Sequence, residues 1–223
     1  MTDATDIEAD AHTRPERRWP MAVAVFAVAI LHALLPEELR VQPSPFLPWV
    51  TLVVLVVLIT LDPGRINRLT TATRVATDVL IGILTLANAY AAGMLVVGII
   101  NNDSFAEPTT LLFSGAAVWV SNAILFGLWY WDLDQGGAAA RANGGNGRPA
   151  FVFPEMQHPE HVPVGWRPIF VDYLAYSFAT AMAFSPTDVS AIRPWAKLLV
   201  VVESLISLGL AALVIARAIN VIT

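Results

Sequence analysis

The sequence predicts an all-α integral membrane protein, either a six-helix bundle or five spanning helices plus a re-entrant pore-type helix. Of its 223 residues, 56% are hydrophobic and only 14% are charged, whereas soluble domains carry about 25% charged residues. The apolar residues are gathered in long runs without the alternation that β-barrel strands require. Because backbone amides in lipid must bond within their own segment, we expect these runs to be helices.

Composition and motifs exclude several classes of function. The net charge of −5 leaves no basic surface for nucleic acid. The absence of cysteine excludes disulfides, thiolate metal ligands and cysteine nucleophiles. The chain carries no phosphate-binding loop, dinucleotide fingerprint or His-Glu-x-x-His motif, so we expect no enzyme, no cofactor and no metal site. The lipid bilayer is the first expected partner.

The first 131 residues predict a short tail and four transmembrane helices. Residues 1–18 are polar and are expected to form a disordered cytoplasmic tail. Within 19–131, proline-rich or Asn/Asp-containing breaks separate four apolar runs, each close to the length that crosses a hydrocarbon core of about 30 Å. No small-residue cleavage site follows the first run, so we expect it to be retained. The runs are Trp19–Leu35, Phe46–Leu61, Ala76–Ile100 and Thr109–Trp131.

Residues 132–166 are rich in glycine and proline and predict a solvent-exposed linker. Nine of the 13 basic residues lie in three places: the N-terminal tail, the connection after Leu61, and the linker as far as Arg167. The connection between the first two apolar runs holds only Arg40. Cytoplasmic loops carry the excess of Lys and Arg. The charge distribution therefore predicts a cytoplasmic N-terminus and a cytoplasmic linker.

Residues 167–223 contain a moderately apolar stretch, Ile169–Phe184, a polar break, and a final long apolar run, Trp195–Ile222. Arg193 and Lys197 precede the final run, which favours a cytoplasmic start and hence a re-entrant 169–184 segment. Arg217, near the end of that run, favours six spans instead. Because 16 apolar-rich residues can just cross the bilayer, six spans are slightly favoured, and both topologies stay open.

A distinctive pattern lies near the C-terminus: Asp172, Tyr173, Tyr176, Ser177 and Phe178, then Phe184, Thr187 and Asp188, then Ala218-Ile219-Asn220. It resembles a family of uncharacterised bacterial integral membrane proteins, which share a Tyr-x-x-x-Ser-Phe…Phe-x-x-(Ser/Thr)-Asp segment before a last helix with an Ala-x-Asn ending. The resemblance covers the C-terminal segment and implies a multi-pass protein of the bacterial inner membrane. It implies no particular activity.

The segment Thr180–Asp188 more distantly resembles the pore module of tetrameric potassium channels, in which a short helix, a filter and an inner helix follow one another. Thr180 and Asp188 match the ends of the filter, with Met182, Phe184, Ser185, Pro186 and Thr187 between them. A carbonyl filter normally uses glycine, and Pro186 restricts φ, so the filter is degenerate. The resemblance implies a constriction at 180–188, monovalent cations and a homo-oligomer, tetrameric if it forms a pore. An ordinary capped turn is the alternative.

Glu203 lies well inside the final apolar run, where a carboxylate costs several kcal/mol unless it is paired, protonated or wetted. On a helix it shares a face with Ser207, Leu210 and Val214, and we expect that face to look into the bundle. Glu203, Ser207 and Asp172 are the candidates for an ion or proton site. A buried hydrogen bond from Glu203 to Asn88 or Asn122 is the alternative.

These observations support two functional hypotheses. The first is an ion channel-like or ion-binding protein of the inner membrane, with a constriction at residues 180–188. The second is a non-conducting structural or interaction protein that uses the 132–166 linker for docking. The group His158, Glu160 and His161 does not alter this choice, because Pro159 interrupts the spacing that a helical metal site would need.

Overall fold

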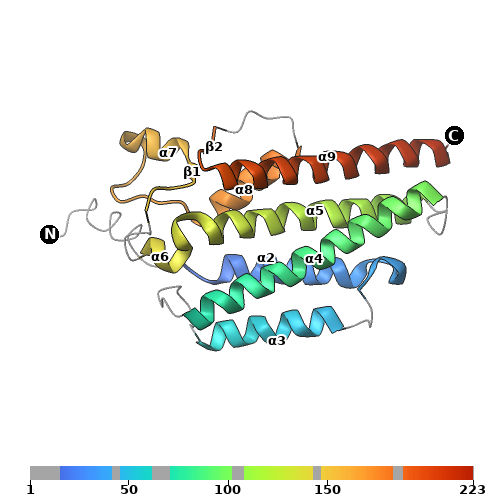
Figure 1. Ribbon diagram of the computed structural model, residues 1–223, viewed down its shortest axis with the longest axis horizontal. Coiled ribbons are helices and arrows are strands. Elements are labelled where there is room, and N and C mark those ends of the chain that lie inside the picture. The colour runs from blue at the N-terminus through green and yellow to red at the C-terminus, as the bar shows by residue number, and fades with distance from the viewer. Residues whose placement is uncertain are drawn as a thin grey trace.

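The computed structural model describes residues 16–41, 46–61, 71–101, 108–142, 147–182 and 188–222. The larger helices are α2 (Trp19–Leu34), α3 (Phe46–Leu61), α4 (Thr71–Asn101), α5 (Pro108–Leu133), α8 (Phe170–Met182) and α9 (Pro194–Ile222). The shorter elements are η1 (Glu37–Leu39), η2 (Asp134–Gly136), α6 (Ala138–Ala142), β1 (Phe151–Val152), α7 (Pro154–Gln157), η3 (Pro159–His161) and β2 (Ser190–Ala191). Figure 1 shows α2, α3, α4, α5 and α9 running along the long axis of the molecule.

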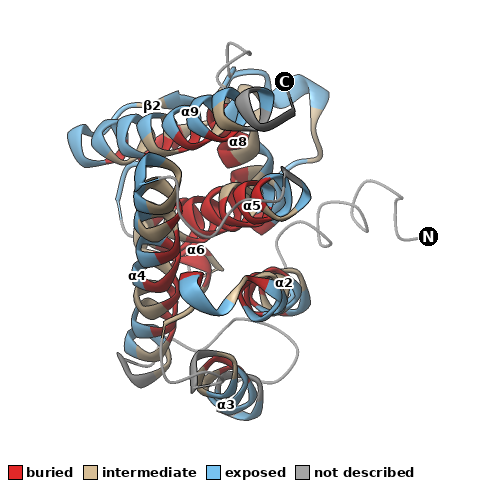
Figure 2. Cartoon of the chain, turned by 90° about the vertical axis from the view of Figure 1, so that its right-hand side faces the viewer, coloured by how far each residue is buried: buried red, intermediate tan, exposed pale blue. Residues whose placement is uncertain are grey.

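Three of these helices, α4, α5 and α9, are long and apolar enough to cross a membrane, and α2 and α3 are shorter apolar helices. The outer faces of the long helices are apolar as well, since Leu86 of α4 and Leu205 of α9 are 73% and 67% exposed. Figure 2 shows this exposed outer surface on α4 and α9. Apolar surface of this extent is stable against lipid and not against water. These features support the predicted all-α membrane class, and they do not test the number of spanning helices.

The helix boundaries follow from local sequence signals. Proline lies in the first turn of α2 and is the first residue of α5 and of α9. Its restricted φ suits the first turn of a helix, where an amide hydrogen would have no helical partner. The apolar runs expected at 19–35, 76–100, 109–131 and 195–222 accordingly agree with α2, α4, α5 and α9 to within a few residues.

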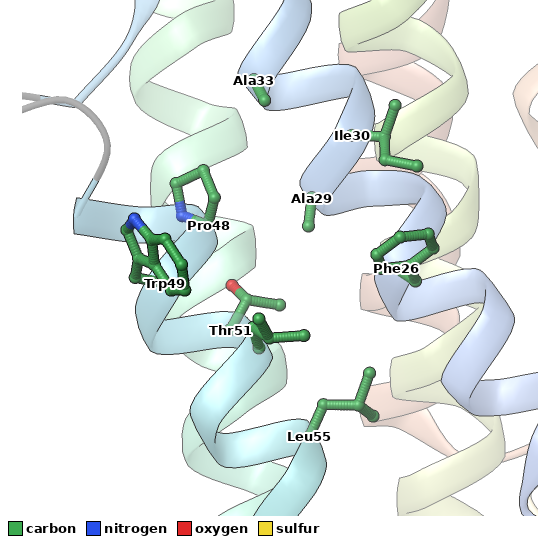
Figure 3. A pocket seen from close by; sticks show the side chains of 9 residues that line it. Phe26, Ala29, Ile30, Ala33, Pro48, Trp49, Thr51 and Leu55 are labelled. Atoms are coloured by element: carbon green, nitrogen blue, oxygen red, sulfur yellow. The ribbon is translucent and has the colours of Figure 1, made fainter.

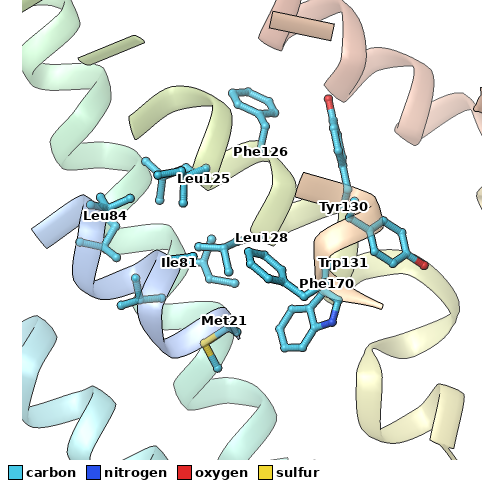
Figure 4. Packing of buried hydrophobic residues seen from close by; sticks show 14 of the residues in the cluster. Met21, Ile81, Leu84, Leu125, Phe126, Leu128, Tyr130, Trp131 and Phe170 are labelled. Atoms are coloured by element: carbon cyan, nitrogen blue, oxygen red, sulfur yellow. The ribbon is translucent and has the colours of Figure 1, made fainter. Parts of the chain in front are cut away.

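Helix α5 is the central element of the bundle and contacts α2, α4, α8 and α9. Its most apolar stretch is 72% buried, against 28% for α4 and 22% for α9. Figure 4 shows the core that forms around it, with Met21 of α2, Ile81 of α4, Leu128 of α5 and Phe170 of α8. The side chains that could line a buried site are therefore those facing α5.

Glycine lets two helices approach α5 closely. A Cβ atom at Gly127 would lie 3.1 Å from the Cα atom of Leu174 in α8, and one at Gly115 would lie 2.7 Å from a Cγ atom of Val214 in α9. Both distances are shorter than ordinary van der Waals contact, so a side chain at either position would push the helices apart. Small residues at helix crossings in membranes have this role.

The range 132–166 differs from the solvent-exposed linker that we expected. Its described residues begin with the last turn of α5 and then pass through a tight turn, in which Gln135, Gly136 and Gly137 have φ values of 52°, 84° and 88°. Strand β1 follows and pairs antiparallel with β2, Phe151 opposite Ala191. Phe151 and Phe153 are buried. The glycines predict a solvent-exposed linker, whereas these two aromatic side chains attach this part of the chain to the bundle.

Helix α8 and helix α9 both begin at the end of the bundle where α5 finishes. Phe170, the first residue of α8, packs its ring on Trp131 near the end of α5. Strand β2 leads into α9 and pairs with β1 at the same end, where Figure 1 also shows α7. Helix α9 thus starts on the same side of the bundle as α8. The 13 residues of α8 span about 20 Å at 1.5 Å per residue.

Candidate functional site

The central feature of the site is Glu203, which projects from α9 and is fully buried. The hydroxyl of Tyr130 on α5 donates a hydrogen bond to its Oε2 atom. The hydroxyl of Ser177 on α8 is within hydrogen-bond distance of its Oε1 atom. The Ser177 oxygen also lies 2.6 Å from the carbonyl oxygen of Ala123 on α5. Three helices therefore meet at one carboxyl group.

A second polar contact lies one turn further along α9. Ser207 accepts a hydrogen bond of 3.0 Å from the side-chain amide of Asn122, and both residues are buried. Leu210 and Val214 are buried on the same face. The predicted inward face of the final helix is therefore correct.

The alternative reading of Glu203, a buried hydrogen bond to a neighbouring helix, agrees with its contacts to α5 and α8, but the partners are not Asn88 or Asn122. Asn122 donates to Ser207, and Asn88 of α4 lies beside His32 of α2. The reason is the antiparallel packing of α5 and α9, which sets Gly115 against Val214 and Asn122 against Ser207. Glu203 therefore meets α5 nearer its C-terminal end, where the long side chain of Tyr130 reaches it.

Aromatic rings pack around Tyr130, the donor to Glu203, and one of them comes from strand β1. The ring of Tyr130 lies 4.9 Å from that of Phe151 and 5.5 Å from that of Tyr176, measured between centroids. Phe151 also contacts the ring of Trp195 at the start of α9. Sequence reasoning missed Phe151, because a phenylalanine that follows a glycine-rich stretch gives no local signal of its distant partners.

A polar cluster closes the same end of the bundle. Asp134 is fully buried and accepts hydrogen bonds from the Tyr173 hydroxyl at 2.6 Å and from the Ala150 amide at 2.7 Å. Arg141 of α6 donates to the carbonyl oxygens of Trp131 and Asp134 at 2.7 and 2.8 Å. These bonds hold the turn after α5 and the segment before β1 against α8.

Glu16 joins this cluster from the N-terminal segment. It accepts hydrogen bonds from the Trp131 indole at 2.9 Å and the Phe170 amide at 2.5 Å, and it lies 3.8 Å from an Nη atom of Arg141. Burial raises the pKa of Glu16, and the two hydrogen bonds and Arg141 oppose this effect. The sequence predicts a disordered tail that includes Glu16, since nothing in the local sequence distinguishes it from the neighbouring acids.

The residues of the filter-like segment are only partly described. Thr180 is buried on α8, Met182 is half exposed, and Asp188 is exposed before β2. The residues between Met182 and Asp188 lie outside the described ranges, so the constriction stays a prediction for Phe184, Ser185, Pro186 and Thr187.

The remaining candidate acids and histidines lie at the surface or at a helix start. Asp172 is in the first turn of α8 and accepts a hydrogen bond of 2.8 Å from the Ile169 amide. His158 and Glu160 form an exposed pair, with Nδ1 and Oε1 3.3 Å apart. Within the described ranges, no group of three His, Cys, Asp or Glu side chains could hold a metal ion.

An apolar groove of about 220 Å³ lies between α2 and α3, and Figure 3 shows its walls. Phe26 and Ile30 line it from α2, and Trp49 and Leu52 from α3. Thr51 is the one polar residue of the lining. The groove is separate from the Glu203 site, which lies on the other side of α5 between α8 and α9.

Comparison with known proteins found no similarity: no family model matches the chain, and neither a curated protein nor a solved structure matches it. The fold defines the class of protein at a coarser level: a mostly helical chain in which, among the described residues, three helices are long and apolar enough to cross a membrane. Its function must be inferred from the geometry around Glu203.

Proposed function

We propose that this protein is a multi-pass protein of the bacterial inner membrane that binds an ion inside its helix bundle and takes part in moving that ion across the membrane. The observation that carries the proposal is Glu203, a fully buried carboxyl group held by hydroxyls from α5 and α8. A well-packed apolar residue would serve stability as well or better at such a position. An acid inside a membrane helix therefore supports a functional role.

The chemistry around Glu203 supports a monovalent ion. Its described hydrogen-bond partners are one tyrosine hydroxyl and one serine hydroxyl, and that serine also contacts the backbone carbonyl of Ala123. Divalent cations such as Ca²⁺ require six to eight oxygen ligands, usually with several carboxylates. One carboxyl group with neutral hydroxyl partners fits an ion of single positive charge.

The proposed topology has five spanning helices, α2, α3, α4, α5 and α9, with α8 as a re-entrant helix. Two features support it. Helix α8, at about 20 Å, is shorter than a hydrocarbon core of about 30 Å. The pairing of β1 with β2 also returns the chain to the end where α8 begins. The basic residues Arg141, Arg148, Arg167 and Arg193 gather at this end, which supports a cytoplasmic location for it.

In this proposal the ion site belongs to one chain. Glu203 is enclosed by helices of its own subunit, which supports a route within the bundle over a route along the axis of a tetramer. A homo-oligomer with the 180–188 segment at its axis is the arrangement implied by the potassium-channel resemblance. It would place Thr180 and Asp188 near the axis and Glu203 away from it.

Ion flux through purified protein in liposomes tests the proposal. We expect wild-type protein to carry protons or a monovalent cation down an imposed gradient, and we expect Glu203→Gln to reduce the flux to that of empty liposomes. The matched control is Glu38→Gln, which makes the same chemical change at an exposed residue of η1. Flux through Glu38→Gln should equal that of wild type.

A wild-type flux equal to that of empty liposomes, across several cations and pH values, would contradict the proposal. The protein would then be assigned to the second hypothesis, a non-conducting structural or interaction protein. Equal flux through wild type and Glu203→Gln would leave transport in place and remove Glu203 from the route.

A further inference from the structure

We infer that the ion held at Glu203 is a proton: in this structure Glu203 is a neutral carboxylic acid that donates to Ser177, which donates to the Ala123 carbonyl. The inference rests on the proposed function, because it names the ion of the same site. It follows from a count of hydrogens in the contacts between α5, α8 and α9.

Ser177 determines the direction of these hydrogen bonds. Its hydroxyl oxygen lies 2.6 Å from the carbonyl oxygen of Ala123 and also contacts Oε1 of Glu203. A serine hydroxyl carries one hydrogen, and a backbone carbonyl can only accept. The separation of 2.6 Å is normal for an O–H···O bond, whereas two oxygens without a hydrogen between them would repel at that distance. Ser177 therefore donates to Ala123.

The hydrogen between Ser177 and Glu203 must then come from Glu203. Oε1 is the hydroxyl oxygen of the acid, and Ser177 accepts from it. On the other side, Tyr130 uses its single hydrogen to donate to Oε2. Each hydrogen then has one acceptor, and each carboxyl oxygen has one partner. If Glu203 were an ionised carboxylate, the two contacts of Ser177, with Ala123 and with Glu203, would share a single hydrogen.

The surroundings of Glu203 agree with a neutral group. The titratable side chain in contact with Glu203 is Tyr130 from α5, and the ring of Tyr176 from α8 packs on that of Tyr130. From its own helix the nearest polar residue on this face is Ser207, and Phe151 of β1 packs on the ring of Tyr130. Among the described residues, no basic side chain pairs with Glu203. A bare carboxylate there would be buried without a counter-charge, at a cost of several kcal/mol.

Infrared spectroscopy of the purified protein in lipid nanodiscs tests the inference directly. A protonated carboxyl group gives a C=O stretching band distinct from that of a carboxylate. We expect this band at pH 7, where a free glutamate with a pKa of about 4.3 is ionised. Subtracting the Glu203→Gln spectrum isolates the contribution of Glu203 from that of Asp132, which has a carboxyl neighbour in Asp78. Glu38→Gln should leave the band unchanged.

Two further variants keep the test valid if Glu203→Gln does not fold. Tyr130→Phe removes the donor to Oε2, and Ser177→Ala removes the acceptor of the acid hydrogen. Each should shift the frequency of the band without abolishing it, because each changes one hydrogen bond of a group that stays protonated. A spectrum at pH 7 in which none of the three variants changes a protonated-carboxyl band would overturn the inference.

Thermal stability gives a second readout. A glutamine amide can donate to Ser177 and accept from Tyr130 in the geometry of a protonated glutamate. We therefore expect Glu203→Gln to melt within about 2 °C of wild type, a difference that corresponds to less than about 1 kcal/mol in a chain of this size. If Glu203 were ionised, Ser177 and Tyr130 would both donate to it, and the NH₂ group of glutamine would then face one of these donors. A loss of many degrees would then count against the inference.

The outcomes separate this inference from the proposed function. A Glu203 band at pH 7 with no ion flux would leave the protonated acid in place and reject the transport role. Flux that depends on Glu203 without such a band would keep the transport role and reject the proton as the resident ion.

Discussion

Glu16 connects the N-terminal segment to three parts of the bundle end: α5, α6 and α8. Its carboxylate accepts from the Trp131 indole and from the Phe170 amide and lies beside Arg141. The first amides of a helix have no partner within the helix, and Phe170 is the first residue of α8. Glu16 therefore caps α8 from a segment more than a hundred residues away in the chain.

The raised pKa of Glu16 predicts a specific pH dependence. Burial raises the pKa from its ordinary value of 4.5, and nearby Asp172 adds to the effect. As the pH rises above 4.5, Glu16 ionises in the unfolded chain before it ionises in the native protein. The native state then binds more protons, so its stability falls with rising pH, by at most about 1.4 kcal/mol per pH unit. The fall ends once the pH passes the native pKa.

The measurement is the apparent melting temperature of wild type and Glu16→Gln in detergent, from pH 4 to pH 9. Because glutamine does not titrate, the difference between the two proteins isolates Glu16. We expect the stability of wild type relative to Glu16→Gln to decrease as the pH rises from about 4.5 and then to level off. A relative stability that increases with pH would show that Arg141 outweighs burial.

Helix α8 is the element on which the candidate site depends most. It supplies Ser177 to Glu203 and Tyr173 to Asp134, and its first amide binds Glu16. It is also held close to α5 by Gly127. Any change that separates α8 from α5 should therefore affect the bundle end and the carboxyl site together.

Gly127→Ala tests this close approach. The new Cβ atom would lie 3.1 Å from a backbone atom of Leu174, which cannot move without moving α8. We expect a loss of about 1–3 kcal/mol in the free energy of unfolding, the usual cost of overpacking. Thermal unfolding in detergent measures the loss.

The matched control is Gly82→Ala in α4, where nothing lies within 4 Å of the new Cβ atom. There alanine should be neutral or should stabilise the helix by up to about 1 kcal/mol. Equal effects of the two substitutions would mean that the spacing between α5 and α8 does not depend on Gly127.

At the scale of the whole molecule, the five-span and six-span topologies differ in the side of the membrane on which Ser190 lies. In the proposed topology, Arg148 and Ser190 lie on one side of the membrane, because β1 pairs with β2. Asn101, at the end of α4, lies on the other side. In a six-span topology, Ser190 and Asn101 would share a side.

Single cysteines distinguish the two topologies without ambiguity, because the natural chain has none. We expect Arg148→Cys and Ser190→Cys to react with a membrane-impermeant thiol reagent from the cytoplasmic side of oriented vesicles, and Asn101→Cys from the opposite side. Reaction of Ser190→Cys together with Asn101→Cys would establish six spans and exclude a re-entrant α8.

Local patterns in the sequence were enough for the helical class, for most helix boundaries, and for the inward face of α9 with Glu203 and Ser207. These properties depend on residues within a few positions of each other: the length of an apolar run, a proline in a first turn, a period of 3.6 residues. They did not reveal the partners of Glu203, the burial of Phe151 or the role of Glu16.

Those features depend on contacts between distant segments, and only the packing of the chain decides them. Tyr130 and Ser177 reach Glu203 because α5 and α9 are antiparallel and Gly127 lets α8 approach. Phe151 becomes buried because β1 meets β2, and Glu16 because it meets the start of α8. The local sequence around a carboxyl group, a phenylalanine or a glycine is the same whether that residue is buried against a distant partner or exposed. Its environment is a property of the assembled bundle.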